Sequence, residues 1–316
     1  MPDPPLVVVA DPIDASAVAR LRAGPCRVVD ASGDPAMLAE PLASAWGLIV
    51  RSRTKVNAAL LAKAPKLALI ARAGVGVDNI DMAAASARGI RVVNAPAAAT
   101  QSVAELAVLF SLLLVRGAYP RMVSTKAGHW ERGTHGGELA GRTVGFVGYG
   151  RTARGTARRF EPFGVTLLAY DPFVPRAVDR TEIVPLEALL ARSDIVSLHA
   201  ALTDGNRHLM DAAAFGRMKA GSFLINVARG ALVDEVALLS ALNSGHLAGA
   251  ALDVFEEEPP MHRELVEHPH VIATPHIGAS TPEAQRRAGD QTVDEVLRAL
   301  RGETLTALVP SPGGAR

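Results

Sequence analysis

The stretch TVGFVGYGRTARGTARRFEPFG, at residues 143–164, has the pattern of a strand, a glycine-rich turn and a helix in that order. Its turn places Gly148, Gly150 and Ala153 at the positions of a G-x-G-x-x-G/A fingerprint. In that fingerprint the first glycine permits a tight turn, the second lets a pyrophosphate approach the backbone, and the third position lets the helix pack closely on the strand. The unpaired N–H groups at the start of such a helix attract phosphate. The stretch therefore predicts a turn that binds a dinucleotide.

An acidic residue stands at the place where this kind of turn needs one. The next apolar run, VTLLAYD, ends at Asp171, which is 21 residues after Gly150. A carboxylate there accepts hydrogen bonds from the adenosine ribose hydroxyls and repels a 2′-phosphate. A glycine turn alone could serve only the backbone, but the strand, turn, helix and acid together are much more specific. They predict NAD, in preference to NADP, as the cofactor.

Short apolar runs alternate with amphipathic stretches along the whole chain. Continuous apolar runs indicate strands buried on both faces, and their alternation with helices indicates parallel pairing. We expect two doubly wound α/β domains with parallel sheets, a long apolar helix at about residues 102–116, and a final helix at residues 282–301. The expected strands of the first sheet are residues 6–10, 27–30, 47–52, 67–73 and 90–95, and those of the second are 143–148, 165–171, 194–200, 222–228, 250–255 and 271–276.

Length and composition narrow the classes of protein and partner. The 316 residues, 49% of them hydrophobic, suffice for two domains with hydrophobic cores. With a net charge of +1 and no long basic run, there is no electrostatic basis for a nucleic-acid partner. The single cysteine, Cys26, excludes an internal disulfide and a cysteine-based metal site, and we expect no bound metal.

No segment has the pattern of a membrane span or a signal peptide. The most apolar stretch, residues 103–115, is interrupted by Glu105 and is shorter than the roughly 20 residues that a span needs. The start, MPDPPLVVVAD, lacks the basic region that precedes the apolar part of a signal peptide. We therefore expect a cytoplasmic protein without a membrane partner.

Three polar residues follow three of the expected strands. Arg229 follows SFLINVA, Glu258 comes shortly after ALDVF, and His276 ends VIATPH. Ligands of open parallel sheets bind beyond the carboxyl ends of the strands. A guanidinium holds a carboxylate, an imidazole exchanges a proton near neutral pH, and a carboxylate beside the imidazole stabilises its charged form. Each residue alone could be a solvated surface residue, but their joint placement predicts a catalytic group.

In its ordered motifs the sequence resembles the D-isomer-specific 2-hydroxyacid dehydrogenase family over nearly its whole length. The motifs are RAGVGVDNID (72–81), SVAEL (102–106), ELAGRTVGFVGYGR (138–151), INVARGALVDE (225–235), ALDVFEEEP (251–259) and TPHIG (274–278). The resemblance implies NAD-dependent hydride transfer to or from C2 of a small D-2-hydroxy acid. It implies that Arg229, Glu258 and His276 are catalytic, and that backbone N–H groups around Val75 and Gly76 hold the substrate carboxylate.

The resemblance also implies further cofactor contacts and an arrangement of domains. Asp253 would contact the nicotinamide carboxamide, and we expect other cofactor contacts at Arg151, Thr152, Thr203, Val227 and Gly278. Family proteins build their substrate domain from both chain ends. We therefore expect a flavodoxin-like substrate domain at residues 1–97 and 287–316, with a Rossmann NAD-binding domain at residues 98–286 inserted in it. A homodimer is implied as well, built partly through the long apolar helix and the region of Trp130.

Few positions depart from the family pattern. Ala153 replaces the third fingerprint glycine, and Thr152 replaces the usual aliphatic residue before it. Ala99 stands where asparagine is common, and Ala201 where proline is common. None of these changes removes a catalytic group; they bear on the cofactor affinity and not on the chemistry.

The sequence defines the substrate less closely than the reaction. Arg51 follows GLIV and Arg72 follows LALIA. Their surroundings are most similar to the phosphoglycerate dehydrogenase branch of the family, in which arginines at these places face the phosphate of 3-phosphoglycerate. We therefore expect interconversion of D-3-phosphoglycerate and 3-phosphohydroxypyruvate, and no regulatory domain after the last expected helix.

Alternatives to this substrate and to this activity remain open at this stage. One or both arginines could form salt bridges instead of binding substrate. Glyoxylate, hydroxypyruvate or a specialised 2-oxo acid are the alternative substrates. An NADH-sensing, corepressor-like binding protein is the alternative of another class.

Overall fold

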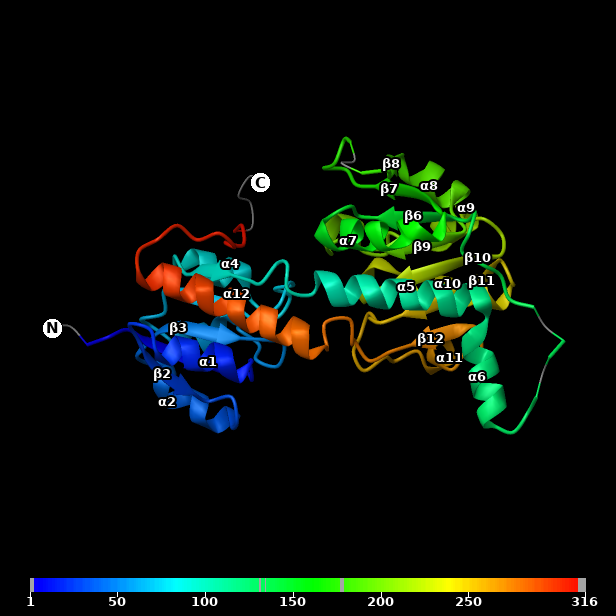
Figure 1. Cartoon of the computed structure of the whole chain (residues 1–316). Coiled ribbons are helices and arrows are strands. Elements are labelled where there is room, and N and C mark those ends of the chain that lie inside the picture. Colours follow the sequence, from blue (N-terminus) through cyan, green and yellow to red (C-terminus); the bar gives the residue numbers. More distant parts are fainter. Residues whose placement is uncertain (1–2, 131, 134, 177–178, 312–316) are drawn as a thin grey trace. The chain divides into compact units, whose positions relative to one another are not determined.

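The computed structural model describes residues 3–130, 132–133, 135–176 and 179–311. Two compact units divide the chain: the terminal unit, Met1–Ala99 with Ala279–Arg316, and the central unit, Thr100–Gly278. Each unit contains one parallel sheet with helices on its faces (Figure 1). The sequence analysis placed the domain boundaries after residues 97 and 286, whereas the two units divide after Ala99 and after Gly278. The second division falls earlier because the whole helix α12 (Pro282–Leu300) belongs to the terminal unit.

The sheet of the terminal unit has the strand order β2-β1-β3-β4-β5, which is the order of flavodoxin-like folds. Every neighbouring pair is parallel. The direction of winding reverses between β1 and β3, and ligands of such sheets bind beyond the carboxyl ends of the strands at this switch point. The strands are β1 (Leu6–Val9), β2 (Arg27–Asp30), β3 (Ala45–Val50), β4 (Leu69–Arg72) and β5 (Arg91–Val93).

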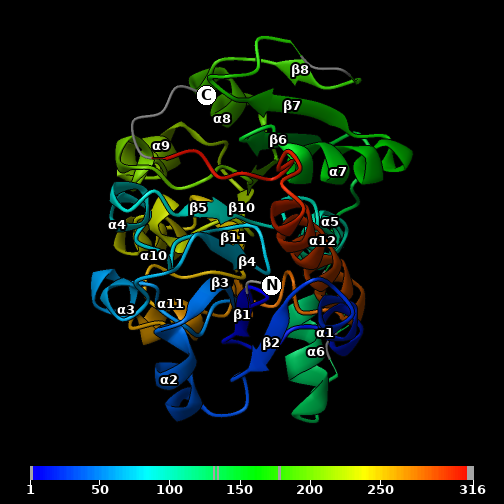
Figure 2. The same ribbon diagram turned by 90° about the vertical axis from the view of Figure 1, so that its left-hand side faces the viewer.

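Alternate residues of these strands form two separate cores. Val7 and Val9 face α1 (Ala15–Arg22) and α12. Leu6 and Val8 belong to the core on the other face, with α2 (Ala39–Leu42), α3 (Ala58–Ala62) and α4 (Met82–Ala87). The two groups of helices lie on opposite sides of the strands (Figure 2). Because both faces are buried, the strands need apolar side chains at successive positions, which explains the continuous apolar runs in the sequence.

The sheet of the central unit has the strand order β12-β11-β10-β9-β6-β7-β8 and is entirely parallel. The winding reverses at β6, which lies between β7 and β9, as in Rossmann folds. Together the two sheets confirm the α/β class with two doubly wound parallel domains. The strands are β6 (Thr143–Val147), β7 (Thr166–Tyr170), β8 (Glu182–Ile183), β9 (Ile195–Leu198), β10 (Ser222–Asn226), β11 (Leu247–Leu252) and β12 (Val271–Ala273).

Helices cover both faces of the central sheet. On one face, α5 (Thr100–Arg116) and α7 (Arg151–Phe160) share a core that includes the buried rings of Phe110, Phe146 and Phe160. The core of the other face is formed with α8 (Leu186–Arg192), α9 (Ala212–Arg217), α10 (Glu235–Asn243) and α11 (Arg263–Val266).

The long apolar helix expected from the sequence is α5. Its buried residues include Ala104, Ala107 and Phe110, so one face of the helix packs in the core, while Leu109 and Leu112 are exposed on another face. Gly117, with a φ of 57°, separates it from α6 (Ala118–Lys126). Among the described residues, no single helix is long and apolar enough to cross a membrane. Only α5 and α6 taken together, bent by 74°, pass that test, and they do so by length and composition alone.

Most strands of the central sheet lie within one or two residues of their expected bounds, but β11 and β12 differ by three residues and β8 was not expected at all. β11 begins at Leu247, before the expected residue 250, because the small residues of LAGAAL fit a crowded strand. A Cβ at Gly249 would lie 2.8 Å from the carbonyl oxygen of His270. β12 ends at Ala273, before the expected residue 276, and the chain then turns toward His276, whose φ is 55°. β8 was not expected, because two residues give no readable periodicity.

Candidate active site

Parallel strands bring distant segments of the sequence to one edge of the central sheet. Gly148 follows β6, Asp171 follows β7, Arg229 comes shortly after β10, and His276 comes shortly after β12. Every neighbouring pair in the sheet is parallel, so all the carboxyl ends lie at the same edge. The residues expected in the cofactor site and in the catalytic group of this unit therefore share that edge.

The two glycines of the turn are required for different reasons. Gly148 has a φ of 87°, and a Cβ there would lie 2.6 Å from the backbone nitrogen of Ala200. The packing of the protein alone therefore requires glycine at this position. Gly150 has a φ of −78°, and a Cβ there would meet no described atom within 4 Å. The protein itself does not need glycine at position 150, and the open space beside it fits a bound pyrophosphate.

The start of α7 is suited to phosphate. Among the described residues, no side chain caps the helix at Gly150. The N–H groups of its first turn, which begins with Arg151 and Thr152, have no partner within the helix. Ala153 is fully buried in the core that α7 shares with α5, so the small third residue of the fingerprint brings the helix close to the sheet. The helix dipole adds to the attraction of these N–H groups for an anion.

Asp171 carries the carboxylate that is expected to bind the adenosine ribose. Its Oδ2 accepts the backbone N–H of Tyr149 at 2.8 Å, and its Oδ1 accepts that of Phe173 at 2.9 Å. A carboxylate has about four acceptor positions, so capacity remains for ribose hydroxyls. The bond from Tyr149 also fixes the acid against the glycine turn.

Three other expected cofactor contacts lie at the same edge. Thr203 is exposed and precedes a short 3-10 helix, where its N–H donates to Oδ1 of Asn206 at 2.7 Å. Val227 directly follows β10 and is buried. The N–H of Gly278 donates to Oδ2 of Asp253 at 2.8 Å. Contact of these residues with NAD stays a prediction.

His276 and Glu258 contact each other directly. Nδ1 of His276 lies 2.9 Å from Oε2 and 3.1 Å from Oε1 of Glu258. Both side chains are partly exposed, at 49% and 41%. Because Nδ1 is engaged by the carboxylate, Nε2 is the ring nitrogen that can exchange a proton with a ligand. An imidazole oriented by a carboxylate in this way is equipped for general acid–base chemistry.

The backbone at His276 is held in a conformation that is uncommon outside glycine. Its φ of 55° is in the left-handed region, and its N–H donates to the carbonyl oxygen of Asp253 at 2.9 Å. The Asp253 carboxylate is buried and accepts bonds from Oγ1 of Thr274 at 2.6 Å, from the N–H of Ile277 at 2.7 Å and from the N–H of Gly278 at 2.8 Å. Asp253, expected only as a nicotinamide contact, therefore also positions the loop that carries His276.

Arg229 lies beside the loop that carries Glu258. Its Nη1 donates to the carbonyl oxygen of Ala228 at 2.7 Å. At the next residue, Gly230, a Cβ would lie 1.8 Å from the carbonyl carbon of Phe255. Only glycine lets the backbone after Arg229 approach the loop of Glu258 this closely. The structure thus brings the three expected catalytic residues into adjacent loops and places two of their side chains in contact.

A second His–Glu pair supports the same loop. The N–H of Glu256 donates to Oε1 of the buried Glu235 at 2.8 Å. The Glu256 carboxylate contacts Arg207 and lies 3.0 Å from Nε2 of His208. These contacts join the loop to α10 and to the segment that follows β9.

A hollow of about 490 Å³ lies beside the His276–Glu258 pair. Its wall is mostly apolar, and it is lined by Phe255, Glu258, Pro259, Pro260, Val266, Ala273, Thr274, Pro275 and His276. A mostly apolar hollow with a few polar groups at one side is typical of a small-molecule binding site.

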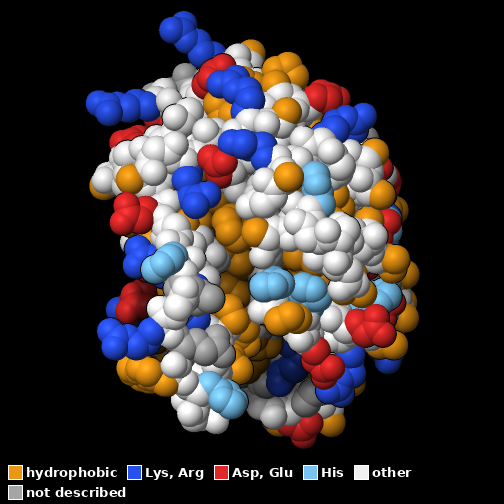
Figure 3. Space-filling view, turned by 90° about the vertical axis from the view of Figure 1, so that its right-hand side faces the viewer, with side chains coloured by type: hydrophobic (Ala, Val, Ile, Leu, Met, Phe, Trp, Pro, Cys, Tyr) orange, Lys and Arg blue, Asp and Glu red, His pale blue; other side chains and the backbone are white. Residues whose placement is uncertain are grey.

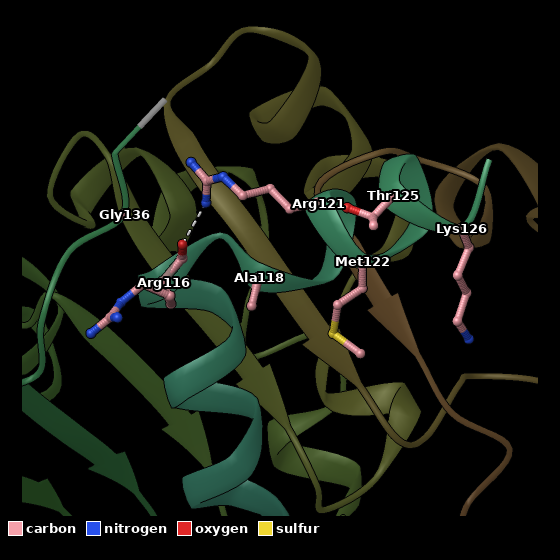
Figure 4. A pocket seen from close by; sticks show the side chains of 7 residues that line it. All are labelled: Arg116, Ala118, Arg121, Met122, Thr125, Lys126 and Gly136. Atoms are coloured by element: carbon pink, nitrogen blue, oxygen red, sulfur yellow. Dashed lines mark hydrogen bonds between the residues drawn. The ribbon is translucent and has the colours of Figure 1, made fainter. Parts of the chain in front are cut away.

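Another hollow, of about 540 Å³, contains none of the expected catalytic residues (Figure 4). It lies at α6 and is lined by Arg116, Ala118, Arg121, Met122, Thr125, Lys126 and Gly136. Nη1 of Arg121 donates to the carbonyl oxygen of Arg116 at 2.6 Å (Figure 4). On the side of the central unit that carries α6, hydrophobic side chains gather in a hollowed part of the surface (Figure 3).

In the terminal unit, Arg51 lies at the switch point of the sheet. It follows β3, and its N–H donates at 2.6 Å to Oδ2 of Asp11, which comes shortly after β1. Burial lowers the pKa of the Arg51 guanidinium, and the charge of Asp11 acts in the opposite direction. Asp11 forms an ion pair with Nε of Arg53, at 3.4 Å. Arg51 thus offers a partly desolvated cation at the place where a ligand of this sheet would bind.

Arg72, Val75 and Gly76 form the loop after the neighbouring strand β4. The Arg72 guanidinium lies over this loop, since a Cβ at Gly74 would be 1.9 Å from its Nη1. The carbonyl oxygen of Val75 accepts a bond from Asn94 at 2.6 Å. The N–H groups of Val75 and Gly76 donate no hydrogen bond to another residue that the structure describes. These two N–H groups fit the expected role of binding a carboxylate.

Four residues that organise these sites were not singled out by the sequence analysis. They are Asp11, Tyr149, Gly230 and Glu235. Asp11 ends the run VVVAD in the way that Asp171 ends VTLLAYD, and that parallel was a usable signal. The others depend on contacts between segments far apart in the chain, which one sequence does not reveal.

The fold and the site define the class of the central unit first. The strand order, the glycine turn and the acid after β7 make it a dinucleotide-binding domain of the Rossmann type. Within the described ranges, no group of three or more His, Cys, Asp or Glu residues could hold a metal ion. Residues 108–278 match the model of the D-isomer specific 2-hydroxyacid dehydrogenase, NAD binding domain. The chain belongs to the D-isomer specific 2-hydroxyacid dehydrogenase family, and the cofactor of its central unit is NAD.

Two curated relatives and one solved structure show the extent of the similarity. The chain is 43% identical to the D-3-phosphoglycerate dehydrogenase of Mycobacterium leprae, with 99% of this chain but only 60% of that protein covered. It is 44% identical to a hydroxypyruvate reductase of Thermotoga maritima, with 80% of this chain and 84% of that protein covered. A glyoxylate reductase of Paecilomyes thermophila superposes with a TM-score of 0.89 at 29% identity, covering 98% and 99% of the two chains.

Proposed function

We propose that this protein is an NAD-dependent oxidoreductase that interconverts a D-2-hydroxy acid and its 2-oxo acid. The observation that carries the proposal is the 2.9 Å contact between Nδ1 of His276 and the Glu258 carboxylate, at the carboxyl edge of the NAD-binding sheet. The family supports the same reaction, since the relatives named above are a dehydrogenase and two reductases.

Different residues of this chain have different roles in the proposed reaction. Bound NAD supplies the hydride acceptor for oxidation, and NADH supplies the donor for reduction. In oxidation, neutral His276 takes the hydroxyl proton at Nε2, and Glu258 stabilises the imidazolium that results. In reduction, the imidazolium returns a proton to the substrate oxygen. Arg229 of the central unit binds the substrate carboxylate with charge-assisted hydrogen bonds and so orients it. In the terminal unit, the N–H groups of Val75 and Gly76 are proposed as carboxylate donors.

Replacing Glu258 with Gln should shift the pH–rate profile of both directions to lower pH. The amide keeps the size of the side chain but loses the negative charge that stabilises the imidazolium of His276. Oxidation needs neutral imidazole and should therefore persist to lower pH than in the wild type. Reduction needs the imidazolium and should fail at a lower pH than in the wild type. The measurement is kcat/KM against pH in both directions.

The matched control is Glu257→Gln, which removes the same charge from the exposed neighbouring residue. It should leave both profiles where they are in the wild type. Profiles that coincide for the two variants would exclude Glu258 from this role.

We propose D-3-phosphoglycerate and 3-phosphohydroxypyruvate as the substrate pair. Arg51 and Arg72 come from neighbouring strands of the terminal sheet, and guanidinium groups bind phosphate with directional hydrogen bonds. The similarity to the phosphoglycerate dehydrogenase of Mycobacterium leprae supports this substrate, although the chain spans only 60% of that protein. The similarity to the hydroxypyruvate and glyoxylate reductases favours an unphosphorylated 2-oxo acid as the alternative.

A panel of 2-oxo acids with NADH, followed by the nicotinamide absorbance, tests both the reaction and the substrate. We expect kcat/KM for phosphohydroxypyruvate to exceed that for hydroxypyruvate or glyoxylate by about tenfold or more, because charged hydrogen bonds to the phosphate contribute about 1.5–3 kcal/mol. A preference for hydroxypyruvate or glyoxylate would contradict the proposed substrate but support the proposed reaction. Tight NADH binding without turnover of any acid would favour the NADH-sensing binding protein instead.

We also propose that the protein forms a homodimer through the α5–α6 side of the central unit. Large apolar side chains are exposed there, namely Leu109, Leu112, Met122, Val123 and Trp130. Such a group of exposed apolar side chains is typical of a protein interface, and a second copy can cover it in an isologous dimer. Light scattering of the purified protein should give twice the mass of one chain, and a mass of one chain would contradict the proposal.

A further inference from the structure

Tyr149 is the residue between the two glycines of the cofactor turn, and its side chain is completely buried. The ring lies 6.5 Å from that of Phe146, centroid to centroid, and the guanidinium of Arg154 lies 5.5 Å from its centre. The fingerprint sets no requirement for a polar group at this position. A buried phenol there needs a specific explanation, because a polar group is costly to bury unless it is hydrogen-bonded.

The phenol connects the turn to the segment that leads from β7 to β8. Oη of Tyr149 lies 2.6 Å from both carboxylate oxygens of Asp179 and 2.7 Å from Oγ1 of Thr181. Asp179 in turn accepts the N–H of Thr181 at 3.0 Å, and Thr181 is buried. We refer to these contacts of Tyr149, Asp179 and Thr181 as the phenol bridge.

The same tyrosine is bonded to the beginning of that segment through its backbone. Its N–H donates to Oδ2 of Asp171 at 2.8 Å. Tyr149 therefore holds the segment at Asp171, where it leaves β7, and again at Asp179 and Thr181, before it enters β8. Both attachments start from the residue that separates Gly148 from Gly150.

The charges of the phenol bridge favour a strong hydrogen bond. Burial and the charge of Asp179 raise the pKa of the Tyr149 phenol, so it remains a proton donor. Burial raises the pKa of Asp179, but the hydrogen bonds from Tyr149 and Thr181 outweigh that effect and hold it below the usual value. A neutral phenol thus donates to an ionised carboxylate, and charge-assisted bonds of this kind are about twice as strong as neutral ones.

We propose that Tyr149 is a positioning residue for the adenosine half of NAD, acting through the phenol bridge. The start of α7 and the carboxylate of Asp171 are the two groups expected to bind that half of the cofactor. The phenol bridge and the bond to Asp171 fix the distance between them. The inference rests on the NAD-binding character of the central unit and is independent of the substrate.

The test is Tyr149→Phe, which keeps the ring and removes only the hydroxyl. The Kd for NADH, measured by fluorescence titration without substrate, should rise about tenfold, because a smaller fraction of the protein then has the binding geometry. The Kd for ADP-ribose, which lacks the nicotinamide, should rise by the same factor. At saturating NADH, kcat should stay within about twofold of the wild type, since the bridge contacts none of the proposed catalytic groups.

Two further variants complete the experiment. Tyr119→Phe removes the hydroxyl of a partly exposed tyrosine in α6 and should change neither Kd. Thr181→Val removes the second contact of the phenol. It should raise both Kd values, though less than Tyr149→Phe does. If Tyr149→Phe fails to fold, Thr181→Val still tests the proposal. Unchanged Kd values in a folded Tyr149→Phe or Thr181→Val variant would overturn the proposal. A rise for NADH without a rise for ADP-ribose would overturn it as well.

Discussion

A His276→Gln variant is expected to lose about a thousandfold in kcat in both directions, because general acid–base catalysis contributes about 10²–10⁴ to such rates. Gln can keep a hydrogen bond to Glu258, but it can neither take the hydroxyl proton nor return one. The KM for the substrate should change much less, since Arg229 remains to bind the substrate carboxylate. Steady-state rates at saturating cofactor, measured in both directions, check the expectation.

His208→Gln is a matched control for this variant. His208 also has a positive φ, of 52°, and its Nε2 also contacts a glutamate, at 3.0 Å from Glu256. Its replacement therefore reproduces the exchange of a glutamate-paired histidine for glutamine at a positive φ, without touching the proposed proton acceptor. We expect kcat of the control to stay within about fivefold of the wild type. Equal losses in the two variants would show that His276 is not the acid–base group.

A Gly230→Ala variant should lose both stability and activity. The added Cβ would lie 1.8 Å from the carbonyl carbon and 2.0 Å from the oxygen of Phe255, and 2.3 Å from the nitrogen of Glu256. These are backbone atoms, so no change of rotamer relieves the overlap, and the two loops must move apart. We expect a loss of about 3 kcal/mol or more in the free energy of unfolding, at the upper end of overpacking effects. Urea denaturation measures it.

The same displacement should lower kcat, because the loop before Gly230 carries Arg229 and the opposite loop carries Glu258. Gly216→Ala is the matched control: this glycine lies within α9, and its added Cβ would meet no described atom within 4 Å. Alanine is the better helix former by up to about 1 kcal/mol, so the control should be neutral or slightly more stable. A Gly230→Ala protein with wild-type stability and kcat would contradict the prediction, because it would show that the two loops need not approach this closely.

The fold could be predicted from the sequence because burial on both faces leaves a plain signature. Runs such as VVVA and TVGFV have no polar side of their own, and they alternate with helices that do. The same logic failed at short or edge elements. β8 has only the two residues Glu182–Ile183, and the expected division at residue 286 falls inside α12, whereas the compact units divide after Gly278, because periodicity does not mark a domain boundary.

The candidate site was predictable as far as it depends on strand ends. Glu258 and His276 were expected together because both follow strands of one sheet, and the structure places them in contact. Asp253 was assigned by resemblance only to the nicotinamide, and its three bonds to the His276 loop could not be read from the sequence. The phenol bridge of Tyr149 could not be predicted for the same reason, since its partners are brought together only by the folded chain.

The place of α12 in the sequence has a consequence for biosynthesis. One face of the terminal sheet, with Val7, Ile49 and Leu69, is covered by α1 and α12. The ribosome makes α12 only after the entire central unit, which is one continuous stretch of chain and can close its own core during translation. Until α12 emerges, the nascent terminal sheet carries uncovered apolar surface. Apolar surface left open at this stage of synthesis is prone to aggregation.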